Sequence, residues 1–276
     1  MVFRLAQAGD HSPEPVLFAD AHVGDTRSQA LSITNTADDD GYSESLNAVI
    51  GSETGHATTN SGSFDLLAAQ ATDNSSLVVG INTSSAGAKT GTATIGLESD
   101  GEGTSDIAGN VALAGQTVNV SGNVYRLAQA SAAAPNPVNI GNVRVGDTAQ
   151  QALTLQNTAL GDGFSENLNA GFSTPSNTGV TASGSISGLA AEAIDTSSLV
   201  VGIDTGSAGS RSGTVDLNLE SDGDGINSLG QSALVGQTVT VSGDVYRLAQ
   251  AGNHTPEPVL FADAHVGDTR SQALSI

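Results

Sequence analysis

Two acidic, glycine-rich segments hold the residues best suited to chemistry in this sequence. Asp100-Gly101-Glu102 is matched by Asp222-Gly223-Asp224, so two carboxylates stand two positions apart with glycine between them in both places. Glycine lets such side chains converge, and carboxylate oxygens are preferred ligands of calcium. Neither segment is followed by Glu at EF-hand spacing, and Asp and Gly are also ordinary turn residues. We predict calcium binding by Asp100, Glu102, Asp222 and Asp224, with a solvated turn as the alternative.

The five histidines do not form a second candidate site. His11 and His22 recur as His254 and His265, whereas the intervening copy of this segment has Arg144 in place of His22. Because a catalytic or metal site lost from every other copy would be unusual, we expect exposed loop histidines. No Ser/His/Asp group or pair of carboxylates with catalytic spacing recurs in both copies. The sequence therefore predicts no catalytic residue and a protein that is not an enzyme.

Covalent cross-links are also limited by composition. There is no cysteine, so neither a disulfide nor a thiolate nucleophile is available. Lys89 is the only lysine, and Arg211 occupies its place in the second copy, which excludes a Lys–Asn isopeptide bond there. Stability must come from apolar burial, at roughly 25 cal/mol per Å².

The charge balance excludes whole classes of partner. Lys and Arg total 8 against 29 Asp and Glu, a formal net charge of -21. Such a surface repels phosphate backbones and anionic lipid headgroups. With no Trp, 3 Tyr and 6 Phe, stacking platforms for nucleic-acid bases are scarce as well. No apolar run approaches the roughly 18 residues of a membrane span, so we expect neither nucleic-acid binding nor membrane insertion of this segment.

A long internal repeat organises the chain. The segment Phe3–Ala8 recurs at Tyr125–Ala130 and at Tyr246–Ala251, at spacings of 122 and then 121 residues. That period suits a whole domain rather than a solenoid unit. We predict repeat 1 over residues 1–123, repeat 2 over 124–244, and the truncated start of a third repeat over 245–276.

Each repeat is predicted to be a β-sandwich. Apolar residues alternate with polar ones, as at Ala93, Ile95 and Leu97, which is typical of strands with one buried face. Runs over 45–50, 63–67, 75–81 and 116–120 lie between Gly, Asn and Asp clusters and indicate about seven or eight short strands per repeat. This number favours all-β, immunoglobulin-like antiparallel sandwiches. The continuous run Leu77-Val78-Val79 predicts a central strand buried on both faces.

Three stretches carry a resemblance to a known family. Val23-Gly24-Asp25-Thr26 leads to Gln29–Thr36, the middle of the repeat reads Leu77-Val78-Val79-Gly80-Ile81, and the end reads Val118-Asn119-Val120-Ser121-Gly122. Their order resembles the choice-of-anchor D and hydin-like immunoglobulin-like modules of bacterial surface and secreted proteins. Ala37 and Ala159 stand where many members have Gly. The resemblance implies an extracellular structural module without catalytic residues.

The junction between the repeats is predicted to be short and stiff. Val118 and Val120 share one face of a strand, whereas Tyr125 and Leu127 fall on the other, as expected where one sandwich ends and the next begins. No Pro-rich or Gly/Ser-rich linker lies between residues 116 and 129.

The segment 246–276 repeats residues 3–33 with three differences, and we expect it to contain only opening strands. Such a segment cannot bury its apolar face alone. It must fray, pack on repeat 2, or complete a sheet in another chain through Leu260, Val266 and Leu274, which would give a head-to-tail filament.

Two main functions remain open. The first is a non-catalytic structural repeat of a secreted or cell-surface stalk or filament, with other copies of the repeat as partners. The second is an adhesin-type module that recognises glycan or protein through loops, for which Tyr42 and Phe164 beside the acidic turns are candidate aromatics. An accessory region of an enzyme is a third possibility. The first two place the chain outside the cell, and neither requires a cofactor besides the calcium considered above.

Overall fold

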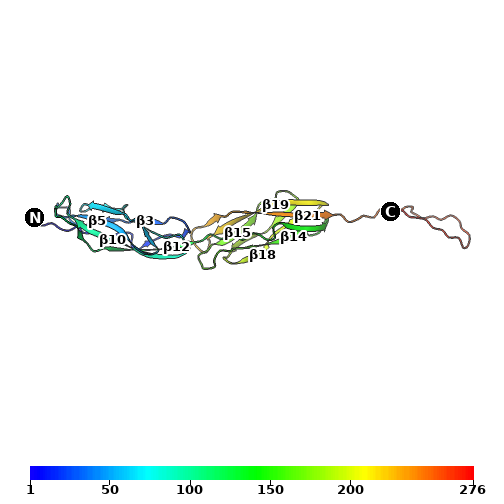
Figure 1. The fold of residues 1–276 in the computed structure, drawn as a ribbon. Coiled ribbons are helices and arrows are strands. Elements are labelled where there is room, and N and C mark those ends of the chain that lie inside the picture. The colour runs from blue at the N-terminus through cyan, green and yellow to red at the C-terminus, as the bar shows by residue number, and fades with distance from the viewer.

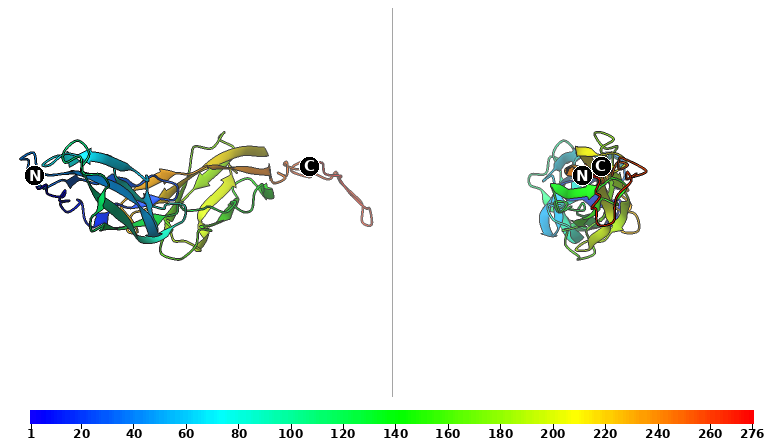
Figure 2. Two further views of the ribbon diagram at one scale, coloured as in Figure 1. Left: turned by 60° about the vertical axis from the view of Figure 1, so that its left-hand side comes forward. Right: turned by 90° about the vertical axis from the view of Figure 1, so that its right-hand side faces the viewer.

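The computed structural model describes residues 1–276 and is built from strands alone. Two elongated β-sandwiches lie end to end, and residues 247–276 extend beyond the second as a chain without strands (Figure 1). Viewed along the long axis, the two units overlap (Figure 2, right). The all-β, immunoglobulin-like fold class is confirmed.

Repeat 1 is assembled around two long strands, β10 (Gly87–Asp100) and β12 (Gln116–Tyr125). They pair in antiparallel fashion, and the larger sheet has the order β1-β12-β10-β5-β7. The smaller sheet, β3-β9-β6, and the pair β4-β8 complete the unit. The other strands are β1 (Val16–Leu17), β2 (Ala21–His22), β3 (Ser28–Ala30), β4 (Ile33–Thr34), β5 (Ser45–Gly55), β6 (Ala57–Thr59), β7 (Ser63–Leu67), β8 (Thr72–Asp73), β9 (Val78–Ile81) and β11 (Val111–Ala112).

Repeat 2 has the same arrangement. Its larger sheet has the order β13-β21-β19-β15-β17, with β20 beside β19, and its smaller sheet has the order β14-β18-β16. In both repeats the opening strand pairs in parallel with the closing strand, β1 and β2 with β12, and β13 with β21. The strands are β13 (Val138–Arg144), β14 (Gln150–Gln156), β15 (Asn167–Phe172), β16 (Val180–Ser183), β17 (Ser185–Leu189), β18 (Ile194–Ile203), β19 (Gly209–Asp222), β20 (Gln231–Ala233) and β21 (Gln237–Tyr246).

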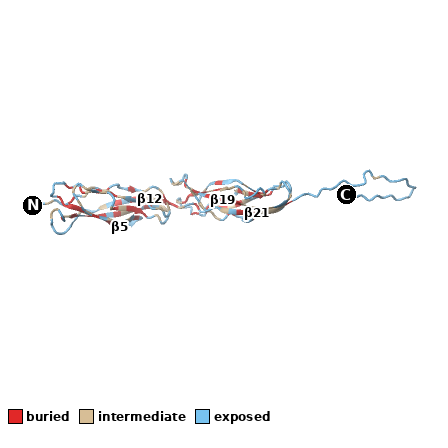
Figure 3. Ribbon diagram, turned by 90° about the horizontal axis from the view of Figure 1, so that it is seen from above, coloured by how far each residue is buried: buried red, intermediate tan, exposed pale blue.

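Each repeat encloses its own core. The period-two pattern is confirmed on β10, where Ala93, Ile95 and Leu97 are buried, and on β19 at Val215, Leu217 and Leu219. Two separate clusters of 19 buried apolar residues result, one in each repeat. Figure 3 shows the buried positions concentrated inside the two units, and the segment after residue 246 is exposed except at the half-buried Val259. The repeats are therefore joined by contacts outside either core.

Several strand predictions need correction. Repeat 1 has twelve strands and repeat 2 has nine, more than predicted. The counterparts of the unbroken β14 and β18 are divided in repeat 1 into β3 and β4 and into β8 and β9, and the short strands β2, β11 and β20 lie beside the larger sheets. The run predicted over 75–81 is a strand only from Val78, and the one predicted over 116–120 continues to Tyr125. β9 is central in its sheet, as predicted, but Val78 is half-buried while Leu77 and Val79 are fully buried. The outer face of a two-layer sandwich meets solvent, so only one face of this strand enters the core.

The separate cores predict that damage to one repeat stays local. Leu217 is completely buried in repeat 2, so Leu217→Ala should lower the free energy of unfolding of that repeat by about 3 to 5 kcal/mol. Hydrogen exchange followed repeat by repeat should show faster exchange in repeat 2 and unchanged protection in repeat 1. Leu160→Ala, at a position 57% exposed, is the control. Equal loss of protection in both repeats would contradict independent cores.

Candidate functional site at the junction of the repeats

The acidic turns predicted to bind calcium are held by hydrogen bonds of their own. Asp100 accepts hydrogen bonds from the Asn47 side chain (2.9 Å) and from the backbone N–H of Glu102 (2.9 Å). Asp222 accepts from Asn169 (2.7 Å) and Gln231 (3.0 Å), and from the backbone N–H of Asp224 (3.0 Å).

These hydrogen bonds stabilise the ionised form of the second turn's carboxylate. The backbone N–H of Asp224, then Gln231 and Asn169, hold the pKa of Asp222 below its ordinary value. Glu102 and Asp224 donate to these carboxylates through their backbone N–H groups, and both residues are exposed. No three His, Cys, Asp or Glu side chains lie close enough together to hold one metal ion. Calcium binding stays a prediction, and a rise in melting temperature with millimolar calcium is the observation that would support it.

The structure instead brings chemically distinctive residues together where the repeats meet. The peptide group between Tyr125 and Arg126 is hydrogen-bonded on both sides. Its C=O accepts from the backbone N–H of Val23 in repeat 1 (2.9 Å), and its N–H donates to the backbone C=O of Phe164 in repeat 2 (2.8 Å). A peptide group is planar, so no rotatable bond separates these two hydrogen bonds. The connection between the repeats, predicted to be short and stiff, is thus a single planar peptide group.

An aromatic pair lies beside this peptide. The ring of Tyr125 packs against Phe164 with centroids 5.6 Å apart and planes tilted by 41°. Tyr125 is buried, as its predicted change of strand face requires, but Leu127 is 38% exposed and Ala128 enters the core of repeat 2 in its place. Tyr125 directly follows buried Val124, so the alternation of β12 breaks between these two residues. Of the aromatics considered for sugar binding, Phe164 is therefore part of the junction.

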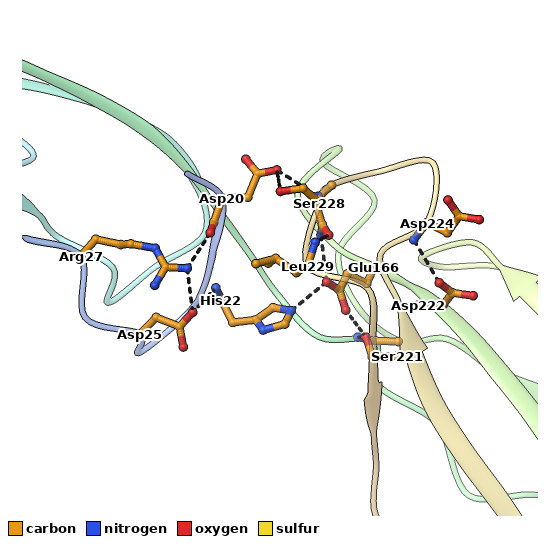
Figure 4. Close-up of polar contacts among 12 residues, drawn as sticks. Asp20, His22, Asp25, Arg27, Glu166, Ser221, Asp222, Asp224, Ser228 and Leu229 are labelled. Carbon is orange, nitrogen blue, oxygen red and sulfur yellow. Dashed lines mark hydrogen bonds and ion pairs between the residues drawn. The ribbon is translucent and has the colours of Figure 1, made fainter. Parts of the chain in front are cut away.

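A histidine–glutamate contact crosses the junction between the repeats. The Nε2 atom of His22 lies 2.7 Å from Oε1 of Glu166, and the Glu166 side chain is completely buried (Figure 4). Ser221 donates to Oε2 (2.6 Å) and Asn227 donates to Oε1 (2.8 Å). Since an ionised carboxylate can only accept, Nε2 of His22 carries the hydrogen of this contact. Three donors, one of them from the other repeat, thus compensate the buried carboxylate.

The loop that presents His22 is fixed within repeat 1. The backbone N–H of His22 donates to the Asp25 side chain (2.9 Å), and Arg27 donates to the backbone C=O of Asp20 (2.6 Å). Asp20 then forms the second polar contact across the junction, because its Oδ2 accepts from both the backbone N–H and the hydroxyl of Ser228, each at 3.1 Å (Figure 4). Contacts within repeat 1 therefore fix the backbone that carries the Asp20 and His22 side chains toward repeat 2.

A salt bridge within repeat 2 holds Arg126, the first residue after this peptide group. Arg126 forms two parallel hydrogen bonds with Asp162, each 2.8 Å, and a third with the Ser165 hydroxyl (3.0 Å). The Arg126 guanidinium, followed by the backbone N–H of Phe164, lowers the pKa of Asp162 to about 2. Asp162 is exposed, so the pair orients the incoming strand more than it stabilises the fold.

The prediction that the histidines are exposed is wrong for two of them. His11 is 8% exposed and contacts Gln116 and Glu14, and His22 forms the contact with Glu166 just described. Only His254 and His265, in the segment after repeat 2, are exposed as expected among the recurring four. The available signal was a glutamate, because Glu44 and Glu166 recur at matching positions directly before β5 and β15. Composition alone could not show that the partner comes from another repeat.

Tyr246 ends β21 of repeat 2, and the chain after it extends away from that repeat. It turns back on itself with a single bridge between Thr255 and Ser275, and Leu260, Val266 and Leu274 are 83%, 108% and 52% exposed. Leu17 and Val23, which correspond to Leu260 and Val266, remain exposed in the complete repeat 1 as well. Leu31, the counterpart of Leu274, is buried. Of the three residues predicted to fill pockets, only Leu274 would therefore do so in a completed sheet.

We predict that His22 stabilises the junction. His22→Ala removes a hydrogen bond to a buried carboxylate and should lower the free energy that couples the repeats by about 1.5 to 3 kcal/mol. Urea unfolding monitored by circular dichroism measures this change. His265→Ala is a matched control, because it lies in the same local sequence without a partner from another repeat. Equal effects of the two substitutions would contradict the assignment.

We predict that the Arg126–Asp162 pair dissociates only in strong acid. A folded-state pKa of about 2, below the ordinary 3.8, means that the pair contributes stability above about pH 4 and loses it as pH falls toward 2. A carbon-13 titration of the Asp162 carboxyl should show this low midpoint. Arg126→Gln should return the midpoint toward the ordinary value, and an unchanged midpoint would exclude Arg126 as the main cause.

Comparisons with known proteins bear on the fold alone. No family model and no curated protein matches the sequence. A PapD-like domain of human CEP192 matches at 10% identity over 44% of this chain and 87% of its own, with a TM-score of 0.31. The human desmocollin-1 ectodomain matches at 7% identity over 90% of this chain and 43% of its own, with a TM-score of 0.39. The Salmonella enterica SafA pilin–SafB chaperone structure matches at 11% identity over 86% and 97%, with a TM-score of 0.30. No helical segment of membrane-spanning length and hydrophobicity is present.

Proposed function

We propose that this chain is a stiff, non-catalytic spacer, a structural repeat segment of a stalk or filament in a secreted or cell-surface protein. The observation that carries the proposal is the junction, where one peptide plane is hydrogen-bonded to both repeats and a buried carboxylate of repeat 2 receives a side chain of repeat 1. A spacer needs a reproducible angle between its units. Flexible tethering of independent binding domains would need none of these contacts.

The separation of the two cores from the junction supports the same function. Each repeat buries its own 19-residue cluster. The stability of each repeat therefore depends on its own sequence and on the interaction energy with its neighbour. Length can then be changed by adding repeats without redesigning a core. The net charge of -21 disfavours collapse or lateral aggregation of such a rod.

Head-to-tail assembly through residues 246–276 belongs to the same proposal. This segment repeats residues 3–33, so it could take the place of the opening strands of repeat 1 in a second copy. There Val259, Leu274 and Ile276 would occupy the positions of Val16, Leu31 and Ile33, all of which are buried. Light scattering of the chain with and without residues 247–276 tests this assembly: a fall from polymer to monomer supports it, and an unchanged mass contradicts it.

Stiffness of the junction is the property to measure. Since the chain has no cysteine, Val49→Cys and Ile194→Cys, at positions 53% and 56% exposed, place one spin label in each repeat. We expect a narrow distance distribution that broadens when His22→Ala or Ser228→Pro removes contacts across the junction. His265→Ala should leave the distribution unchanged. A broad distribution in the unsubstituted chain would contradict a spacer function.

The adhesin alternative is separated by a different experiment. Phe18 and Phe172, two further candidate aromatics, pack against the two cores, and Phe164 is in the junction. Of these candidates only Tyr42, 44% exposed and in contact with Phe3, remains on an exposed loop. Specific binding on a glycan array that is lost in Tyr42→Ala would favour an adhesin-type module. Absence of specific binding leaves the spacer as the function the geometry supports best.

A further inference from the structure

The far end of repeat 1 reproduces the surface with which repeat 2 receives its neighbour. Arg4 pairs with Asp40 and Ser43 as Arg126 pairs with Asp162 and Ser165. Phe3 packs on Tyr42 at 5.8 Å, close to the 5.6 Å of Tyr125 and Phe164. The backbone N–H of Arg4 donates to the C=O of Tyr42 (2.7 Å), which is the contact of Arg126 with Phe164. We call this surface, formed by Phe3, Arg4, Tyr42, Glu44 and Ser105, the Glu44 face.

One contact is missing from the Glu44 face. Glu44 is 5% exposed and accepts hydrogen bonds from the hydroxyls of Ser99 (2.8 Å) and Ser105 (2.8 Å). These correspond to the contacts of Glu166 with Ser221 and Asn227, but no group takes the part of His22, and no cation pairs with Glu44. A buried carboxylate with an open acceptor position is the feature that a partner from outside would satisfy.

The end of repeat 2 carries the complementary feature. Arg144 stands at the position of His22, and its backbone N–H donates to Asp147 (2.8 Å) as that of His22 does to Asp25 (2.9 Å). The loop is therefore formed in the same way. The side chain of Arg144 is exposed and has neither an ion pair nor a hydrogen bond. Its guanidinium would reach a facing carboxylate with up to two parallel hydrogen bonds.

A second position agrees with the first. Asp20 faces Ser228 in the observed junction, and Asn142 replaces Asp20 at the end of repeat 2. The residue that follows Ser105 on the Glu44 face is Asp106, whereas Ser228 follows Asn227. The amide of Asn142 can donate a hydrogen bond to the Asp106 carboxylate, whereas an aspartate at position 142 would repel that carboxylate. The end of repeat 1 therefore suits repeat 2 better than another repeat 1, and the end of repeat 2 suits the carboxylates of the Glu44 face.

We propose that the Glu44 face binds the Asn142–Arg144 end of repeat 2 from a second copy of this two-repeat unit placed directly ahead of it, with Arg144 pairing with Glu44, so that the two repeat types alternate strictly. The sequence after repeat 2 agrees with this order, because Tyr246 begins a copy of repeat 1 and its C=O already accepts from the N–H of Val145 (3.0 Å), as that of Tyr125 does from Val23. The inference rests on the proposed spacer function and names the partner surface within it.

The test is a four-repeat chain in which residues 1–246 are followed directly by residues 4–276. This seam keeps the sequence Tyr-Arg found at 246–247. Spin labels at Ile194→Cys in the first copy and Val49→Cys in the second report on the seam. We expect a distance distribution as narrow as that of the observed junction.

Arg144→Gln in the first copy should reduce the ratio of docked to undocked seam about tenfold or more, as expected for a lost hydrogen bond to a buried charge. Arg144→Gln in the second copy has no Glu44 face after it and is the matched control. Identical results for the two positions would overturn the pairing with Glu44.

A second pair of variants tests alternation separately. Asn142→Asp with Arg144→His in the first copy gives the end of repeat 2 the carboxylate and imidazole found in repeat 1. This double substitution should loosen the seam, because the carboxylate introduced at position 142 repels Asp106. Adding Asp106→Ser in the second copy should restore docking. A seam that stays docked without this change would overturn strict alternation. If the observed junction stays stiff while the seam is loose in every chain, the spacer function stands and only this inference fails.

Discussion

The arrangement of the two repeats depends on one planar peptide group. Tyr125 and Arg126 share it, and its two polar atoms are bonded to different repeats, so rotation at the junction must break at least one hydrogen bond. Flanking contacts then select a single orientation: the aromatic pair, the contact of His22 with Glu166 and the contact of Asp20 with Ser228. The long axis seen in Figure 1 follows from this connection, because neither core contains residues of the other.

Burial of a carboxylate makes the junction directional. Glu166 is completely buried and satisfied by three donors, two from its own repeat and one from the preceding repeat. An acceptor at one end of each repeat and a donor at the other can join only head to tail. Contacts between apolar patches would have been less selective, since apolar burial is not directional.

Polar contacts also explain why the repeats are similar without being identical. The core positions of β10 and β19 carry aliphatic residues in both repeats, Ala93 and Ile95 in one and Val215 and Leu217 in the other, so the apolar pattern is retained. The end positions differ in charge: His22 and Asp20 in repeat 1 correspond to Arg144 and Asn142 in repeat 2. Differences at the ends of the repeats leave the sandwich unchanged.

The sequence by itself determined the fold class, the period of the repeat and the absence of a linker, because alternation of apolar residues and recurrence of Phe3–Ala8 are local properties that can be read along the chain. It also identified Tyr125 as a residue that changes face. Only the tertiary structure decided that His22 is not a free loop residue and that Glu166 is buried, since the two are 144 residues apart and lie in different repeats. The tertiary structure likewise showed that Asp100 accepts a hydrogen bond from Asn47 and Asp222 accepts one from Asn169. Spacing along the chain fixes which side chains share a strand face, whereas the partner of a polar group depends on how separate sheets and repeats come together in space.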